Sequence, residues 1–404
     1  MGKTSSKVAY LDGIRGVAAF LVFFHHFLLA FYSAFFNSDA TNSHLNNLEI
    51  RYGQSVLSVF SNGHFMVCIF FVLSGFVLSR KYFQNNNFEI IVSGAHRRFL
   101  RLYIPVATVM ILGYILLKAG LYYNVAAGKI THSVWWLSQL WVFPDPPLLK
   151  LWQCLKVQTM FFNDSTFDTS LWTMAIELTG SFFVFAFLAL THNIKNKFVI
   201  LIIVLVYCKI TEQAILSDFV FGIGLNYIEP RAFKVNKFFT LLIVLFLFAS
   251  GLILGSYPSN WEIKGTLYEH LPEWIFQYRG WFHVIGAFFV VLAFVISPVL
   301  QRLFSLKPFR FLGYISFAFY LLHPLVIGSF SCYMFLHIYE RWGYNHSTVA
   351  VFVATIPVCI LVSWLMTRFI DDPGIRFSKY VYERWLKKST VPFQNNESIS
   401  DNSK

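Results

Sequence analysis

Charged residues are scarce in this 404-residue sequence. Lys, Arg, Asp and Glu together make up 13% of it, about half of the roughly 25% found in an average soluble domain. Hydrophobic residues make up 56% and aromatic residues 19%. So few charges cannot cover a water-soluble surface, and the composition therefore excludes an ordinary soluble domain.

Cysteines are also few and carry no recognisable pattern. The five are odd in number and scattered, without a CxxC pair, so neither a disulfide framework nor a metal site is predicted from them. We expect buried apolar thiols. A cleavable signal peptide is not evident either, because the first apolar stretch, Ile14–Phe36, is too long for one and lacks a small-residue cleavage site.

Long apolar runs are what the sequence does contain. A membrane-spanning helix needs about 20 apolar residues at 1.5 Å each. The runs predict an all-α, polytopic transmembrane helix bundle of about ten spans, the fifth and sixth of which are short. The predicted spans are 12–36, 60–80, 102–121, 170–191, 198–211, 213–229, 238–256, 281–300, 311–337 and 348–369.

The distribution of Lys and Arg predicts the orientation of this bundle. With both termini in the cytoplasm, 22 of the 32 basic residues lie inside, nine lie outside and Arg15 lies within the first span. Basic residues are enriched in cytoplasmic loops, so the net charge of +12 needs no nucleic acid partner. We expect a transmembrane domain over residues 1–376 and a cytoplasmic basic and polar tail over 377–404, disordered at its end.

Ionisable side chains within the apolar spans are costly and are therefore candidate functional residues. Arg15 and His26 are eleven residues apart, close to three helical turns, so they share one helix face about 16 Å apart. A histidine at that depth can act as a general base. The structural alternatives are a positive-inside anchor for Arg15 and an interhelical hydrogen bond for His26. Estimated depths bring Glu177 and His323 to the layer of His26.

Two further features point to substrates. If the segment is helical, Arg97 and Arg98 each share a face with Arg101, and such a cluster suits phosphate, although it also fits a plain topology determinant. The Ser74-Gly75 pair either permits close helix packing or loosens a helix to admit substrate.

Tryptophans are concentrated in the predicted outer segment 122–169. Tryptophan-rich stretches usually lie at the level of the lipid headgroups. The alternative is a platform on which a sugar stacks.

The ordered set of these motifs resembles the acyltransferase-3 family of membrane O-acyltransferases, which includes O-antigen and other glycan O-acetylases. Arg15 and His26 fit the family's arginine, ten intervening residues and histidine. Later segments are similar in the same order: Phe71-Val72-Leu73-Ser74-Gly75-Phe76, Arg98-Phe99-Leu100-Arg101 followed by Pro105, Leu171-Trp172-Thr173-Met174-Ala175-Ile176-Glu177, Leu312-Gly313-Tyr314-Ile315-Ser316 through Tyr320-Leu321-Leu322-His323-Pro324, and Asp372-Pro373.

The resemblance implies transfer of an acyl group, commonly acetyl, from cytosolic acyl-CoA to a hydroxyl of an envelope glycan or a lipid-linked saccharide, by a multi-pass protein of the plasma or inner membrane. Acyl-CoA is then a co-substrate, with no bound cofactor and no metal. His26 would be the catalytic base, oriented by Glu177 or His323, and Tyr320 or Ser316 would stabilise the oxyanion. The CoA-binding and substrate-binding residues would be Arg15, Arg97, Arg98, Arg101, Ser74 and Gly75.

Other functions remain open at the level of sequence. Buried His, Glu and Arg would also suit a transporter that uses them as a proton or substrate relay, although no inverted repeat or paired broken helices are visible. A non-catalytic scaffold is another alternative. Within the enzyme hypothesis, a covalent acyl-histidine competes with direct transfer.

Overall fold

The computed structural model describes residues 6–142, 148–228, 236–260, 262–276 and 279–387, and every regular element in these ranges is helical. Eight helices are long and apolar enough to cross a membrane, which confirms the predicted all-α polytopic bundle. They are built on α1 (Ser6–Phe31), α4 (Gly63–Asn85), α5 (Phe88–Lys118), α9 (Trp172–Leu190), α12 (Lys237–Gly255), α14 (Arg279–Ile296), α16 (Lys307–Val326) and α18 (Tyr344–Met366).

The fifth and sixth predicted spans form shorter helices. α10 (Lys197–Ile210) has 14 residues and α11 (Ala214–Ile228) has 15. At 1.5 Å per residue each is about 21–23 Å long, less than a hydrocarbon core of about 30 Å. Within the described residues, eight of the ten predicted spans therefore have helices of full spanning length.

Short helices complete the described chain. Between α1 and α9 they are α2 (Ala34–Asn37), η1 (Ala40–Asn42), α3 (Leu48–Gln54), η2 (Val56–Ser61), α6 (Asn124–Ile130), η3 (Leu137–Gln139), α7 (Leu148–Gln153), η4 (Cys154–Gln158), α8 (Thr159–Phe162) and η5 (Thr169–Leu171). After α12 they are α13 (Glu273–Phe276), α15 (Pro298–Phe304), η7 (Ile327–Ser331), α17 (Cys332–Trp342), η8 (Thr367–Asp371), α19 (Asp372–Val381) and η9 (Tyr382–Leu386).

The segment 80–101, which connects the second predicted span (60–80) to the third (102–121), is almost entirely helical. α4 ends and α5 begins within a run of asparagines: Asn86 adopts the left-handed conformation (φ 47°) that ends a helix, and the Asn87 side chain accepts a hydrogen bond from the Glu89 amide at 2.9 Å. The arginines at 97, 98 and 101 consequently lie on one long helix.

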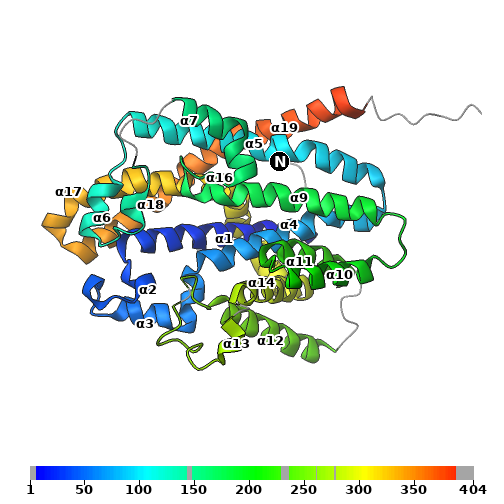
Figure 1. The fold of residues 1–404 in the computed structure, drawn as a ribbon, viewed down its shortest axis with the longest axis horizontal. Coiled ribbons are helices and arrows are strands. Elements are labelled where there is room, and N and C mark those ends of the chain that lie inside the picture. The colour runs from blue at the N-terminus through cyan, green and yellow to red at the C-terminus, as the bar shows by residue number, and fades with distance from the viewer. Residues whose placement is uncertain (1–5, 143–147, 229–235, 261, 277–278, 388–404) are drawn as a thin grey trace, which may run out of the picture.

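α1 lies in the middle of the bundle and packs most extensively against α16, with α4 on another side. The glycines of two sequence motifs allow this contact, because a Cβ on Gly16 would lie 2.5 Å from the Gly313 backbone nitrogen. In Figure 1 the long helices run side by side along the long axis. Helices α2, α3, α6 and α17 gather at one end, which we call the α2 end, and the α9–α10 connection lies at the other, which we call the α10 end.

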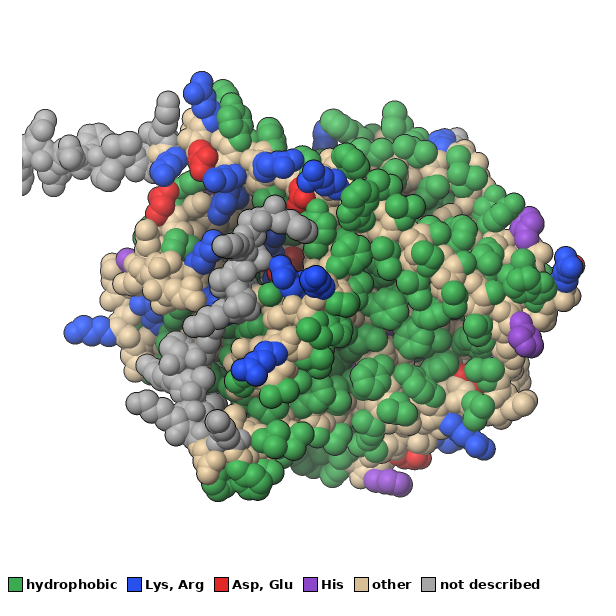
Figure 2. Space-filling view, turned by 180° about the vertical axis from the view of Figure 1, so that it is seen from behind, with side chains coloured by type: hydrophobic (Ala, Val, Ile, Leu, Met, Phe, Trp, Pro, Cys, Tyr) green, Lys and Arg blue, Asp and Glu red, His purple; other side chains and the backbone are tan. Residues whose placement is uncertain are grey.

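The surface of the bundle matches a lipid environment. Figure 2 shows a broad hydrophobic surface, with Lys and Arg side chains gathered at the α10 end. This is the end that the charge count assigns to the cytosol, and that assignment stays a prediction. Residues 377–386 of the predicted tail continue the helix of α19 and η9, whereas the predicted disorder of 389–404 lies outside the described residues.

Candidate active site

The two motif histidines meet inside the bundle. His26 Nδ1 lies 2.7 Å from His323 Nε2. The ring planes differ by 16° and the centroids are 5.0 Å apart, which is the geometry of two nearly coplanar imidazoles joined edge to edge by a hydrogen bond. His323 is fully buried, and His26 is partly exposed. The packing of α1 on α16 thus joins two residues that are 297 positions apart.

The hydrogen bonds around this pair define its tautomers. His323 Nδ1 lies 3.1 Å from the Phe319 carbonyl oxygen, which can only accept, so Nδ1 carries the proton. In a neutral imidazole His323 Nε2 must then accept, and His26 Nδ1 is the donor to it. His26 Nε2 is left with its lone pair, as a general base requires. His26 lies five residues, about 8 Å, before α1 ends at Phe31.

A tryptophan forms one side of this histidine site. The Trp136 ring lies 5.3 Å from the His26 ring with planes 16° apart. The remaining tryptophans described in this segment differ from it: Trp141 is buried against Tyr122, and Trp135 and Trp152 are about half exposed. Sequence alone identified the aromatic segment but could not select Trp136, because the choice depends on how the segment folds back over α1.

Glu177 belongs to a second polar cluster. Its carboxylate pairs with the Arg98 guanidinium and accepts a hydrogen bond from Ser74 Oγ at 2.6 Å. Arg98 Nε also donates to Ser181 Oγ at 2.7 Å, one turn further along α9. Glu177 therefore joins α4, α5 and α9, and within the described contacts His323, not Glu177, orients His26. Equal estimated depth did not mean proximity in the bundle.

Tyr320 lies between the two clusters. Its hydroxyl is 3.0 Å from Thr173 Oγ1, one helical turn before Glu177, and its ring is 6.0 Å from the His323 ring. Ser316 shares this face of α16 but donates to the Gly313 carbonyl at 2.8 Å, and it lies seven residues, about 10 Å, from His323.

Charged side chains gather where α1 begins. The Arg15 guanidinium lies 3.8 Å from the Asp12 carboxylate. The charge of Arg101 repels it and the charge of Glu177 attracts it. Arg310, at the start of α16, acts on the same Asp12 carboxylate. Arg101 and Arg310 are exposed, so this group, which we call the arginine mouth (Arg15, Arg101, Arg310), presents open guanidinium groups beside the helix that also carries His26. Arg310 lies outside the motifs and was not singled out from sequence.

Two predicted substrate residues have other neighbours. Arg97 Nε donates to the carbonyl of Ser93 on its own helix at 3.0 Å. Gly75 packs against the α11 backbone at Phe219, which fits the packing interpretation of the Ser-Gly pair.

A second histidine pair was not singled out from the sequence. His64 Nδ1 lies 2.8 Å from His283 Nδ1, which links α4 to α14. His25 lies between the two pairs: its ring is 5.2 Å from that of His26, and it lies against the backbone of Gly63. Because His64 and His283 belong to no recognised motif, only the three-dimensional arrangement reveals them.

Comparison with known proteins assigns the class. The sequence model of the acyltransferase-3 family, described as an acyltransferase domain, matches residues 8–364. The chain belongs to this family of integral membrane acyltransferases. It is 25% identical to acyltransferase clz18 of Cochliobolus lunatus, with 90% of this chain and 93% of that protein covered.

Two other relatives agree with this assignment. O-acetyltransferase PaAT-1 of Phomopsis amygdali is 24% identical over 96% of this chain and 87% of its own length. Acyltransferase R4 of a Phoma species is 23% identical, with 93% and 96% covered. No solved structure matches the chain significantly. The protein is therefore an acyl-transferring membrane enzyme, and the transporter and scaffold alternatives lose their support.

Proposed function

We propose that this enzyme is an O-acetyltransferase that carries an acetyl group from cytosolic acetyl-CoA to a hydroxyl of an envelope glycan or glycolipid on the other side of a plasma or inner membrane. The observation that carries the proposal is His26, whose Nδ1–H is fixed by His323 and whose Nε2 has no hydrogen bond to any described residue. A base held in one tautomer is what removal of a hydroxyl proton needs.

The reaction balances without a further reactant. His26 Nε2 takes the proton of the acceptor hydroxyl as its oxygen attacks the thioester carbonyl. The C–S bond of the resulting oxyanion then breaks, and the imidazolium returns the proton to the CoA thiolate. Tyr320 is nearer than Ser316 to the His26–His323 pair, because its ring lies 6.0 Å from the His323 ring. Its hydroxyl, which donates to Thr173 Oγ1, would stabilise the oxyanion by turning from Thr173 to it.

The arginine mouth is the part of the site that would bind acetyl-CoA, the acyl donor. We assign the CoA phosphates to Arg15 and Arg101, whose guanidinium groups are partly or largely exposed, with Arg310 beside them. Arg98 is less suited to this role, because Glu177 and Ser181 already occupy it. From Arg15 the pantetheine arm would follow α1 for about 16 Å to His26.

Trp136 and one relative support a saccharide hydroxyl as the acceptor. A flat indole beside His26 can stack on a sugar ring, and it comes from a segment at the α2 end. One relative is itself named an O-acetyltransferase.

The sidedness of the donor tests the proposal. In sealed vesicles that contain the protein in one known orientation, acetyl-CoA should be consumed only when it is supplied at the α10 end, from which α1 runs toward the α2 end. Opening the vesicles with detergent should abolish the difference. Equal use of acetyl-CoA from both sides, or no use from either, would contradict the proposal.

A further inference from the structure

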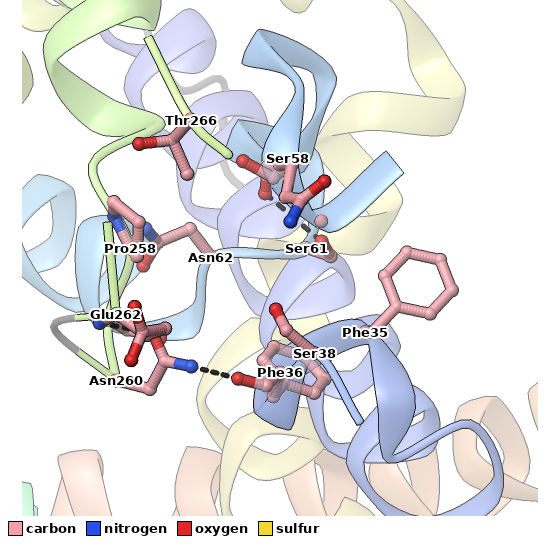
Figure 3. Close-up of a pocket in the computed structure, with 13 residues that line it drawn as sticks. Phe35, Phe36, Ser38, Ser58, Ser61, Asn62, Pro258, Asn260, Glu262 and Thr266 are labelled. Carbon is pink, nitrogen blue, oxygen red and sulfur yellow. Dashed lines mark hydrogen bonds between the residues drawn. The ribbon is translucent and has the colours of Figure 1, made fainter. Parts of the chain in front are cut away.

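A hollow at the α2 end is too small for a substrate. Figure 3 shows it between Phe36 and Asn260, and the Asn260 side-chain amide donates a hydrogen bond to the Phe36 carbonyl. The hollow has a volume of about 30 Å³, which is room for a few water molecules. A larger partner therefore needs a different surface, and the C-terminal end of the described chain provides one.

One face of α18 is apolar over most of the thickness of a hydrocarbon core. α18 continues through η8 and α19 into η9 without a break. Along α18 an exposed and uncharged side chain recurs at every fourth position: Val349, Val353, Pro357, Leu361 and Leu365. At 1.5 Å per residue this stripe is about 24 Å long, compared with a hydrocarbon core of about 30 Å. The stripe therefore suits contact with lipid chains.

The exposed residues change in kind where the stripe ends. Arg368 is the first exposed charged residue after Leu365. The exposed residues of α19 and η9 are then basic or aromatic, together with one carboxylate: Arg376, Phe377, Lys379, Tyr380, Glu383, Arg384 and Trp385. The three aromatic side chains are 50%, 57% and 71% exposed, so they add little to the packing of the bundle. We call these seven residues the basic aromatic face.

The opposite side of α19 and η9 is held against α5. Gly374, Ser378 and Tyr382, again at every fourth position, are buried. The Tyr382 hydroxyl donates to the Glu89 carboxylate at 2.5 Å, and Gly374 lies against the Ile104 side chain. Figure 1 shows α19 beside α5. Because this side is fixed on α5, the basic aromatic face points away from the bundle.

The charge of the face selects an acidic partner. Three basic residues stand against one acidic residue, which leaves a net charge of +2. Lys379 Nζ lies 3.7 Å from the Glu383 carboxylate, and such an exposed pair is weak. Arg376 and Arg384 are suited to phosphate, which guanidinium groups bind through two hydrogen bonds. A soluble polyanion would leave the aromatic rings in water, whereas the headgroup layer of a membrane accommodates both basic and aromatic side chains.

We propose that the basic aromatic face is a binding site for acidic phospholipids. Arg376 and Arg384 contact the lipid phosphates, and the rings of Phe377, Tyr380 and Trp385 lie in the headgroup layer. Since α18 begins at the α2 end beside α17, the lipids belong to the leaflet at the opposite end, which the charge count assigns to the cytosol. Such a site does not depend on the acyl donor or acceptor, so it can be tested apart from the transfer reaction.

Lipid titration of the purified full-length protein tests this site. Native mass spectrometry gives the dissociation constants for phosphatidylglycerol, which is acidic, and for phosphatidylcholine, which is zwitterionic. The test variant combines Arg376→Gln, Lys379→Gln and Arg384→Gln. The matched control removes the same charge from exposed residues of other segments: Lys129→Gln, Lys264→Gln and Arg341→Gln. Thermal unfolding in detergent shows whether both variants are folded, and all six positions are exposed, so wild-type melting is expected.

The wild-type protein should bind phosphatidylglycerol about tenfold or more tightly than phosphatidylcholine, because each basic residue near an acidic surface contributes about fivefold. The test variant should lose about tenfold or more of its affinity for phosphatidylglycerol and keep its affinity for phosphatidylcholine, and Arg384→Gln alone should lose about fivefold. The control should match the wild type. Equal affinity of the wild type for the two lipids, or an equal loss in the control, would overturn the proposed site.

Discussion

Replacement of His26 by alanine is expected to lower the kcat of acetyl transfer by about 10²–10⁴-fold, the usual contribution of a general base. The KM for acetyl-CoA should change little, because the CoA phosphates are assigned to the arginine mouth about 16 Å away along α1. Release of CoA thiol from acetyl-CoA by the purified enzyme gives both constants.

Two further variants make this result specific. His323→Ala should cost less than His26→Ala, because it removes the group that orients the base and leaves the base itself. His337→Ala is the matched control, since His337 is exposed and its Nδ1 lies 2.8 Å from a carbonyl of its own helix. If His26→Ala kept the wild-type rate, or if His337→Ala lost as much, the assignment of the base would be wrong.

Breaking the Arg98–Glu177 pair is expected to produce the largest loss of stability. Arg98 and Glu177 are largely buried (side-chain exposures 9% and 13%), and the carboxylate also holds Ser74. Removing one partner of such a pair leaves a buried charge and typically costs about 3–5 kcal/mol. We therefore expect Arg98→Met to lower the free energy of unfolding in detergent by about that amount.

The double variant separates charge from packing. Arg98→Met combined with Glu177→Met removes both charges and should recover most of the lost stability. Glu383→Gln is the control, because the Lys379–Glu383 pair is exposed and such pairs contribute roughly 0–1 kcal/mol. A single variant as stable as wild type would show that the pair does not hold α5 to α9.

The sequence predicted the parts of this structure that follow from one helix at a time. Apolar runs located the long helices, and the spacing of Arg15 and His26 placed both on one face of α1. The limits of α4 and α5 were missed, because the basic composition of 80–101 resembles a cytoplasmic loop while its asparagine caps allow helix almost throughout.

Contacts between helices could not be predicted in the same way. Depth estimates brought His26, His323 and Glu177 to one layer, but rotation of each helix decides which side chains meet. His323 turns toward His26, whereas Glu177 turns toward Arg98. Trp136 lies on a segment that folds back from outside the spans, and Arg310 lies just before the predicted span 311–337, so no periodicity within a span could identify them.

The most direct measurement is a structure of the enzyme bound to a non-hydrolysable acetyl-CoA analogue. The account predicts that the phosphates lie at Arg15 and Arg101 and that the acetyl carbonyl lies beside His26 Nε2, with the pantetheine arm along α1. An analogue that enters from the α2 end, or whose acetyl group ends away from the His26–His323 pair, would contradict it.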